Sequence, residues 1–248
     1  MTDHVIVHDD RAVRIVRMNR PDKKNALTGA MYQALTHAIA SAADQRVRCL
    51  AIMGVPGAFC AGNDLQDFLA AAQSGRLDRH AVQFLHALAR SAVPLVAGVQ
   101  GAAIGVGTTM LLHCDYVVAG TDARFSTPFV KLGLVPEAAS SLLAPRLMGH
   151  RHAFATLVMG RELDATAALG CGLINATVVP QQVDAEALKA AYEIAALPPE
   201  AVAASRRLMR GSLDEVVARI DQEVILFDER LRSAEARAAF EAFFARKR

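Results

Sequence analysis

The sequence has 248 residues, 53% of them hydrophobic, so the chain is long enough to bury one substantial core. Its 27 basic and 25 acidic side chains leave a formal net charge of +2, which argues against a dedicated nucleic-acid surface and against an anionic membrane partner. The four cysteines form no CxxC pair and have no histidine at zinc spacing, so we expect reduced thiols and no metal site.

The N-terminal part of the chain predicts a hairpin, a helix and a buried strand. Val5–Val7 and Ala12–Met18 have the short apolar pattern of two opening strands. Thr28 can cap a helix that runs to about Ala43. Apolar residues recur on one face of that helix, at Met31, Leu35, Ala38, Ile39 and Ala42. The apolar run Cys49–Met53 then predicts a short buried strand.

A second helix and strand follow the same order. The segment Leu77–Arg90 predicts a helix that ends before Ser91 and Pro94, and Leu95–Val99 predicts the next strand. The apolar stripe of this helix consists of Val82, Leu85, Leu88 and Ala89. Alternation of short strands with helices is typical of an α/β fold built on a mostly parallel sheet.

The second half of the chain becomes progressively more helical. Gly101–Gly107 predicts a glycine-rich turn, Thr108–His113 a helical segment, and Tyr116–Ala119 another strand. Ile174–Val179 can supply one more strand, and from Asp184 onward nearly the whole chain has helical patterning.

Pro198–Pro199 and Gly211–Ser212 interrupt this helical tail, and its last helix is predicted over Leu213–Phe244. We expect that helix to bury Val216, Val217, Ile220, Val224, Phe227, Leu231, Phe240 and Phe243. So long an apolar stripe needs a partner surface, either on its own domain or on another subunit.

Three segments could present backbone amides or a carboxylate to a ligand: Phe59–Leu65, Gly101–Thr109 and Phe125–Glu137. Each also has an ordinary structural interpretation, as a capped loop, a tight turn or an acid in the first turn of a helix. The glycines of the second segment are spaced GxxxGxG, so they do not form a dinucleotide fingerprint. A GxxxxGK[ST] phosphate loop and a GxSxG nucleophile elbow are also absent from the sequence.

In this order and separation, the three segments and the opening Arg20–Leu27 resemble the crotonase (enoyl-CoA hydratase/isomerase) superfamily. The resemblance implies an α/β fold of repeated ββα units wound in a spiral, with a C-terminal helical region. It divides the chain into a core at residues 1–195 and a helical region at 196–248 for trimerisation or active-site cover. It also implies an acyl-CoA thioester substrate, with coenzyme A as part of the substrate and no separate cofactor.

The resemblance implies catalytic and CoA-binding roles for particular residues. The backbone amides of Asn63 and Val106 match the positions that form the family's oxyanion hole, and any residue other than proline can supply such a donor. Lys24, Ala26, Ala61, Asp64 and Leu65 match positions that hold the CoA nucleotide and pantetheine.

The departures from the family pattern bear on the reaction. Hydratases of the family hold water between two glutamates, but Thr109 and Phe129 occupy those positions here, and neither takes up a proton at neutral pH. Phe129 is therefore expected to contact substrate. Glu137 matches the single acid/base of peroxisomal-type Δ3,Δ2-enoyl-CoA isomerases, which Gly62–Leu65 followed by Phe68 also resembles.

The expected reaction is a double-bond shift, in which Glu137 moves a proton from C2 to C4 while the two amides stabilise a dienolate. Apolar neighbours such as Phe129, Leu134 and Val135 would raise the pKa of Glu137 if they surround it.

Other functions stay open. Enoyl-CoA hydration remains possible if Glu137 alone orients water, as does hydrolysis or dehalogenation with Glu137 as nucleophile. A non-enzymatic acyl-CoA-binding or RNA-binding member of the fold is the alternative from another class. RNA binding needs basic side chains on an exposed helix, and residues 28–43 contain no Lys or Arg.

The remaining expectations concern partners and location. We expect His113 to be a packed helix residue and His150 and His152 to lie in a solvated helix start rather than at a metal. Residues 1–11 lack the pattern of a targeting signal, and the basic tail Arg246–Arg248 is expected to be solvated. The predicted protein is cytoplasmic, binds neither nucleic acid nor membrane, and forms a homotrimer or a dimer of trimers.

Overall fold

The computed structural model of the chain describes residues 2–42, 46–64, 66–67, 69, 73 and 76–245. Two sheets form its centre, a six-stranded one in the order β1-β2-β3-β5-β7-β10 and a four-stranded one in the order β4-β6-β8-β9. The strands are β1 (Val5–Asp10), β2 (Val13–Met18), β3 (Cys49–Met53), β4 (Ala58–Cys60), β5 (Leu95–Val99), β6 (Ala102–Ile104), β7 (Tyr116–Gly120), β8 (Arg124–Ser126), β9 (Leu163–Asp164) and β10 (Ala176–Val178).

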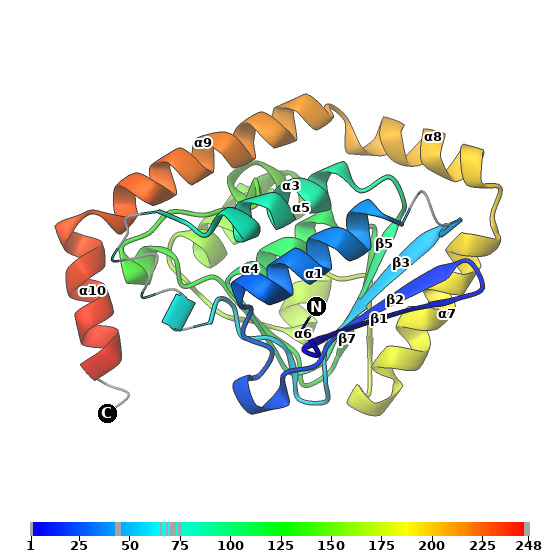
Figure 1. The fold of residues 1–248 in the computed structure, drawn as a ribbon, viewed down its shortest axis with the longest axis horizontal. Coiled ribbons are helices and arrows are strands. Elements are labelled where there is room, and N and C mark those ends of the chain that lie inside the picture. The colour runs from blue at the N-terminus through cyan, green and yellow to red at the C-terminus, as the bar shows by residue number, and fades with distance from the viewer. Residues whose placement is uncertain are drawn as a thin grey trace.

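Helices surround these sheets, and the last four follow one another at the end of the chain (Figure 1). They are α1 (Gly29–Ala40), α3 (Arg79–Arg90), α4 (Val106–Thr109), α5 (Ser140–Leu157), α6 (Ala165–Gly170), α7 (Val183–Ala196), α8 (Pro199–Arg210), α9 (Leu213–Leu231) and α10 (Ala234–Ala245). Short 3₁₀ segments are η1 (Pro21–Lys23), η3 (Met110–His113), η4 (Val130–Leu132) and η5 (Pro180–Gln182).

The chain repeats a strand-strand-helix unit. In the pairs β3 and β4, β5 and β6, and β7 and β8, the first strand joins the large sheet and the second joins the small one. Neighbouring strands from successive units run parallel in both sheets. The predicted α/β fold of repeated ββα units with a C-terminal helical region is therefore confirmed.

The large sheet is buried on both faces, which explains why its central strands are continuous apolar runs. In β3, Leu50 and Ile52 pack into the cluster that contains α1 and α3, whereas Cys49, Ala51 and Met53 pack into the cluster that contains α7. The alternation follows from the two-residue period of a strand.

Helix starts follow the expected chemistry. The side chain of Thr28 caps α1 by accepting a hydrogen bond from the Met31 amide at 3.3 Å. The helix ends at Ala40, and Ala43, where we expected it to end, lies outside the described residues. Asp78 caps α3, which begins at Arg79, two residues later than expected. Its buried stripe consists of Ala81, Phe84, Leu85, Leu88 and Ala89, and the predicted member Val82 is only half-buried.

Two sequence-based expectations are wrong. The supposed glycine-rich turn Gly101–Gly107 contains strand β6, which is too short for a hydrophobic period to reveal. The predicted last helix Leu213–Phe244 is two helices, because Ser233 caps α10 by accepting a hydrogen bond from the Ala236 amide at 3.1 Å.

Helices α8 and α9 run along one side of the molecule, and α9 passes over α3 and α5 (Figure 1). The buried face of α9 consists of Val216, Ile220, Glu223, Phe227 and Leu231, while the predicted Val217 and Val224 are half-buried. The side chain of Phe243 lies outside the described parts of the chain. The long stripe thus finds a partner surface on its own domain. The functional division at residue 195 stays a prediction.

Among the described residues, no helix is both long and apolar enough to cross a bilayer.

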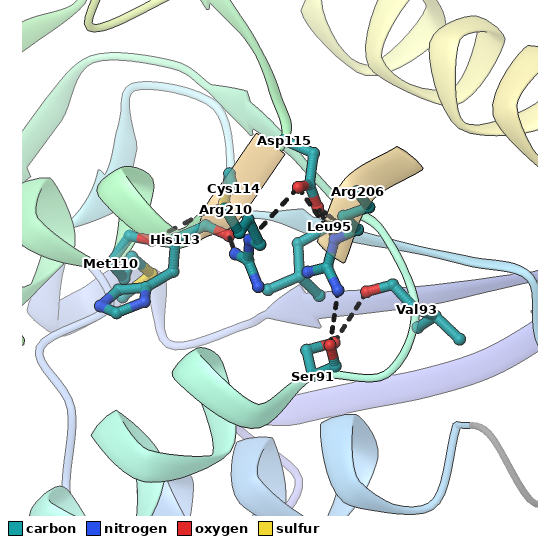
Figure 2. A network of polar contacts seen from close by, with 9 residues as sticks. All are labelled: Ser91, Val93, Leu95, Met110, His113, Cys114, Asp115, Arg206 and Arg210. Carbon is teal, nitrogen blue, oxygen red and sulfur yellow. Dashed lines mark hydrogen bonds and ion pairs between the residues drawn. The ribbon is translucent and has the colours of Figure 1, made fainter. Parts of the chain in front are cut away.

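An ion-pair network fastens α8 to the core (Figure 2). The Asp115 carboxylate accepts two hydrogen bonds from Nε of Arg206, at 2.9 and 2.8 Å, and another at 2.8 Å from the Leu95 amide. Nη1 of Arg206 donates to the Ser91 carbonyl at 2.6 Å, and Nη2 of Arg210 donates to the His113 carbonyl. The pair Arg206–Asp115 is mostly buried, with side-chain exposures of 11% and 22%.

We expect Asp115→Ala to lower the free energy of unfolding by about 2 kcal/mol, because it leaves partly buried guanidinium groups without their acceptor. Urea denaturation measures the effect. Glu215→Ala is the matched control, since its pair with Arg146 is half-exposed, and it should cost less than about 0.5 kcal/mol. Equal losses for the two variants would contradict this role for Asp115.

Candidate active site

Three parallel strands of the small sheet lead into the predicted catalytic residues. Asn63 follows β4, Val106 follows β6, and Glu137 follows β8 after a longer connection. Because β4, β6 and β8 are neighbours that run in the same direction, their carboxyl ends meet at one edge of the sheet. Open α/β sheets commonly bind ligands at this edge.

The Asn63 amide lies in a short backbone ladder. Asn63 forms an isolated parallel bridge with Leu27, and its side-chain oxygen accepts a hydrogen bond from the Tyr32 hydroxyl at 2.5 Å. Within the described part of the chain, the Asn63 N–H has no hydrogen-bond acceptor. Among the described residues, nothing competes with a ligand for this amide. No sequence pattern indicated that Tyr32 would bind the Asn63 side chain.

The Val106 amide is the first N–H of α4, and glycines on either side allow its position. Gly105 has φ +57°, a conformation that L residues rarely adopt. A Cβ on Gly107 would lie 2.6 Å from the Cys60 carbonyl oxygen, so only glycine lets α4 pack this closely on β4. The Val106 N–H also lacks an acceptor among the described residues.

Glu137 is a buried carboxyl held against α4. It is 6% exposed, and its Oε1 accepts a hydrogen bond from the hydroxyl of Thr109, one turn after Val106. Burial raises the pKa of Glu137 to about 8, although the Thr109 hydrogen bond lowers it, and the nearby carboxylate Glu223 raises it further. A carboxyl with a pKa near the working pH suits proton transfer.

The backbone after Glu137 is strained. In the Glu137 turn, defined as residues 137–141, Ala138 and Ala139 have φ values of +62° and +53°. The left-handed region costs an L residue roughly 1–2 kcal/mol, so surrounding contacts must hold this turn. His113 provides one, since its Nε2 lies 2.8 Å from the Ala138 carbonyl oxygen. Burial lowers the pKa of His113 to about 4, so the ring is neutral and packed, as expected.

The structure brings four of the five predicted CoA-binding residues together. The Ala61 amide donates to the Lys24 carbonyl at 2.9 Å, and the Asp64 amide donates to the Leu27 carbonyl at 2.8 Å. Residues 24–27 and residues 61–64 therefore run side by side. Leu65 and Phe68 lie outside the described residues.

The carboxylate of Asp64 forms an ion pair within the protein. It binds Nη1 of Arg20 at 2.7 Å, and the same guanidinium nitrogen donates to the Ala26 carbonyl at 2.9 Å. Burial opposes the charge of Asp64, but the hydrogen bond from Arg20 holds the pKa of this carboxyl below its usual value. The side chain therefore ties the two segments to each other, and Lys24 is an exposed cation beside them.

The other residues singled out in the sequence are Phe129, two histidines and the basic tail. Phe129 is buried at the start of η4, so that position carries an apolar side chain where hydratases carry a glutamate. His150 and His152 are exposed in α5, next to the break at Gly149. Among the described residues, no three metal-ligating side chains lie close enough to hold an ion. The basic tail Arg246–Arg248 falls outside that part of the chain.

A second buried carboxyl, Glu223, was missed by sequence reasoning. It is 4% exposed and lies on α9 in register with Val216, Ile220 and Phe227. An acid at an apolar position of a helical stripe was the signal that could have found it.

Comparison with known proteins supports the resemblance. The family model described as enoyl-CoA hydratase/isomerase matches residues 8–248. The rat protein named enoyl-CoA delta isomerase 2 is 31% identical over 88% of this chain, but the match spans only 57% of that protein's own length. A probable enoyl-CoA hydratase of Mycobacterium tuberculosis is 36% identical over 86% of this chain and 85% of its own.

Solved structures agree. The structure of Pseudomonas aeruginosa OdaA has a TM-score of 0.92 with 40% identity, covering 98% of this chain and 99% of that one. An enoyl-CoA hydratase/isomerase from Pseudoalteromonas atlantica has the same TM-score and identity and covers 98% of both chains.

We expect Thr109→Val to raise the pKa of Glu137 further, because the lost hydroxyl no longer stabilises the carboxylate. The titration of the ¹³C-labelled glutamate carboxyl, followed by NMR, measures the change. Thr108→Val is the control, since the Thr108 hydroxyl donates to the Ala103 carbonyl at 2.6 Å rather than to Glu137. A lowered or unchanged pKa in Thr109→Val would count against the hydrogen bond described above.

Proposed function

Because this chain belongs to the enoyl-CoA hydratase/isomerase family, we propose that it is a Δ3,Δ2-enoyl-CoA isomerase with Glu137 as its single acid/base. The family makes it an enzyme that acts on an acyl-CoA thioester, and the site suggests which reaction it performs. The observation that supports isomerisation is the pairing of one buried carboxyl, Glu137, with Thr109 at a position where hydratases carry a second acid.

An allylic shift needs one group that removes a proton and gives it back. The ionised carboxylate of Glu137 takes a proton from C2 of a 3-enoyl-CoA, and the electron pair moves onto the thioester oxygen to form a dienolate. The same carboxyl, now protonated, delivers the proton to C4 as the double bond forms between C2 and C3. Substrate and product have the same atoms, so the reaction consumes no other reactant.

The N–H groups of Asn63 and Val106 would stabilise the charge on the thioester oxygen. Both amides lack acceptors among the described residues, and both follow adjacent strands at the edge where Glu137 lies. Losing one such donor typically costs about 2.7 to 4 kcal/mol of activation free energy. The fixed backbone means that the donors need no reorganisation as charge develops.

The remaining predicted roles follow from the same alignment of segments. The paired backbone of Lys24, Ala26, Ala61 and Asp64 would hold the nucleotide and pantetheine of CoA, together with Leu65, and Phe129 would contact the acyl chain. Lys24 is exposed and can meet a phosphate. Coenzyme A enters as part of the substrate, so the proposed reaction uses no separate cofactor.

We also propose assembly as a homotrimer or a dimer of trimers. The C-terminal helices α8 and α9 expose large apolar side chains, and monomeric proteins rarely expose large contiguous apolar patches. The most exposed are Met209 at 86%, Leu208 at 83% and Ile225 at 60%.

Hydration is the second candidate function. The M. tuberculosis relative is named a probable enoyl-CoA hydratase, and Glu223 is a second buried carboxyl, whose charge raises the pKa of Glu137. However, Glu223 is bound to the backbone of α5, and hydration by Glu137 alone would lack the second carboxylate that orients water.

Separate incubations with a 3-enoyl-CoA and a trans-2-enoyl-CoA distinguish the two reactions. We expect the first to yield the 2-enoyl product at constant mass, and the second to remain free of the 3-hydroxyacyl product that is heavier by one water. Liquid chromatography of the acyl-CoA pool separates the two enoyl isomers, and mass spectrometry detects the hydrated product. Turnover of only the trans-2-enoyl-CoA would contradict the isomerase proposal and favour hydration.

Glu137→Gln should lower kcat by at least about a hundredfold, the scale of general acid/base catalysis, while the affinity for CoA stays unchanged. The wild-type kcat/KM should rise with pH through about 8, because only the ionised carboxyl can accept the C2 proton and its pKa is raised to about 8. Isothermal titration with CoA and circular dichroism are the controls for binding and folding. An unchanged kcat would remove Glu137 from this role.

A further inference from the structure

Glu223 is a charged group in an apolar environment that the proposed reaction does not use. It lies on the buried face of α9 between Ile220 and Phe227, where a helix that packs on a core ordinarily carries an apolar residue. Burying a carboxyl without compensation is costly, so its contacts indicate what it does.

The carboxylate of Glu223 binds the first turn of α5. Its Oε1 accepts hydrogen bonds from the amide of Ser141 at 3.0 Å and from the hydroxyl of Ser141 at 2.5 Å. The first amides of a helix lack partners within the helix, and the N-cap residue of α5, Ala139, has no side chain that could bind them. Glu223 therefore caps α5 from another helix. Nη1 of Arg219 supports the contact by donating to the Ser141 hydroxyl at 3.2 Å.

The capped residues belong to the Glu137 turn. Its two left-handed alanines separate Glu137 from α5, and such a backbone persists only where neighbouring groups determine it. His113 holds the turn from the core side through the Ala138 carbonyl, and Glu223 holds it from the α9 side through Ser141. The orientation of Glu137 thus depends on both contacts.

We propose that Glu223 is a positioning residue for Glu137, which it holds in place by capping α5 from the C-terminal helix. The catalytic part of this proposal rests on the proposed role of Glu137 in proton transfer. The structural part, that Glu223 fixes the Glu137 turn, stands on the contacts alone.

The charge of Glu223 acts on the pKa of Glu137, whereas the other groups around Glu137 are neutral. Tyr32 from α1 and Cys60 from β4 both face Glu137, but burial raises the pKa of Tyr32 well above 10 and that of Cys60 to about 12, so both are neutral. Thr109 from α4 is a neutral donor. His113 from η3 is neutral because burial lowers its pKa to about 4.

The charge of Glu223 gives the effect its sign. Burial raises the pKa of Glu223 against the hydrogen bonds from Ser141 and the charge of Arg219, and the negative charge of Glu223 in turn raises the pKa of Glu137. Removing that charge should make Glu137 ionise at lower pH.

Two substitutions separate capping from charge. Glu223→Gln keeps an oxygen that can accept from Ser141 but removes the charge, whereas Glu223→Ala removes both. For Glu223→Ala we expect kcat to fall about tenfold or more with KM within about twofold of wild type, since the turn moves Glu137 rather than the CoA-binding segments. Glu223→Gln should recover most of kcat and shift the rising limb of kcat/KM to lower pH, by about half a unit or more.

Glu229→Ala and Glu229→Gln are the matched controls. Glu229 is an exposed glutamate on the same helix, so its substitutions should leave kcat, KM and the pH profile unchanged. Circular dichroism of all four variants tests that they fold.

Hydrogen exchange provides a readout that does not depend on the reaction. We expect the Ser141 amide to exchange about tenfold faster or more in Glu223→Ala than in wild type, because it loses a charged acceptor, and to keep its protection in Glu229→Ala. Faster exchange at Ser141 in a protein that does not isomerise 3-enoyl-CoA would support the cap and contradict the proposed function.

An unchanged Ser141 exchange rate in Glu223→Ala, or a wild-type kcat in an isomerising Glu223→Ala, would overturn the proposal for Glu223 and leave the proposed function standing.

Discussion

A carboxyl group that is 6% exposed must be held in place and must give up its hydration, and the region around Glu137 is built to meet both requirements. One donor, the Thr109 hydroxyl, compensates the carboxyl directly. Because this compensation is incomplete, the group keeps a pKa of about 8, so it can be both a base and an acid near neutral pH. Without the burial, Glu137 would be an ordinary carboxylate, too weak a base to remove a proton next to a thioester.

The small sheet and the C-terminal helices position different parts of the site. The small sheet and the glycines at 105 and 107 place the amides of Asn63 and Val106 by backbone geometry, which tolerates the unusual side chains at these positions. The C-terminal helices hold the Glu137 turn. Arg210 of α8 binds the carbonyl of His113, whose ring binds the Glu137 turn, and α9 reaches the same turn through Glu223.

Sequence patterns predicted the large elements well and the contacts between them poorly. The buried strands at Cys49–Met53 and Leu95–Val99 have the predicted bounds, because a continuous apolar run between breakers leaves little choice. Strand β6 was mistaken for a turn, since three residues among glycines carry no measurable period. The family resemblance suggested Glu137, Asn63 and Val106 as site residues, but nothing local indicated that Thr109 binds Glu137 or that Glu223 caps α5. Both contacts join residues that are far apart in the chain, 28 and 82 positions respectively.

The proposed function requires Glu137 and the two amides to act on the same acyl group. A crystal structure of the Glu137→Gln variant with bound 3-enoyl-CoA tests this arrangement. We expect the thioester oxygen to lie about 3 Å from the nitrogens of both Asn63 and Val106, with the residue 137 side chain within about 3.5 Å of C2 and C4. A thioester oxygen bound elsewhere, or a residue 137 side chain directed away from the acyl carbons, would contradict it.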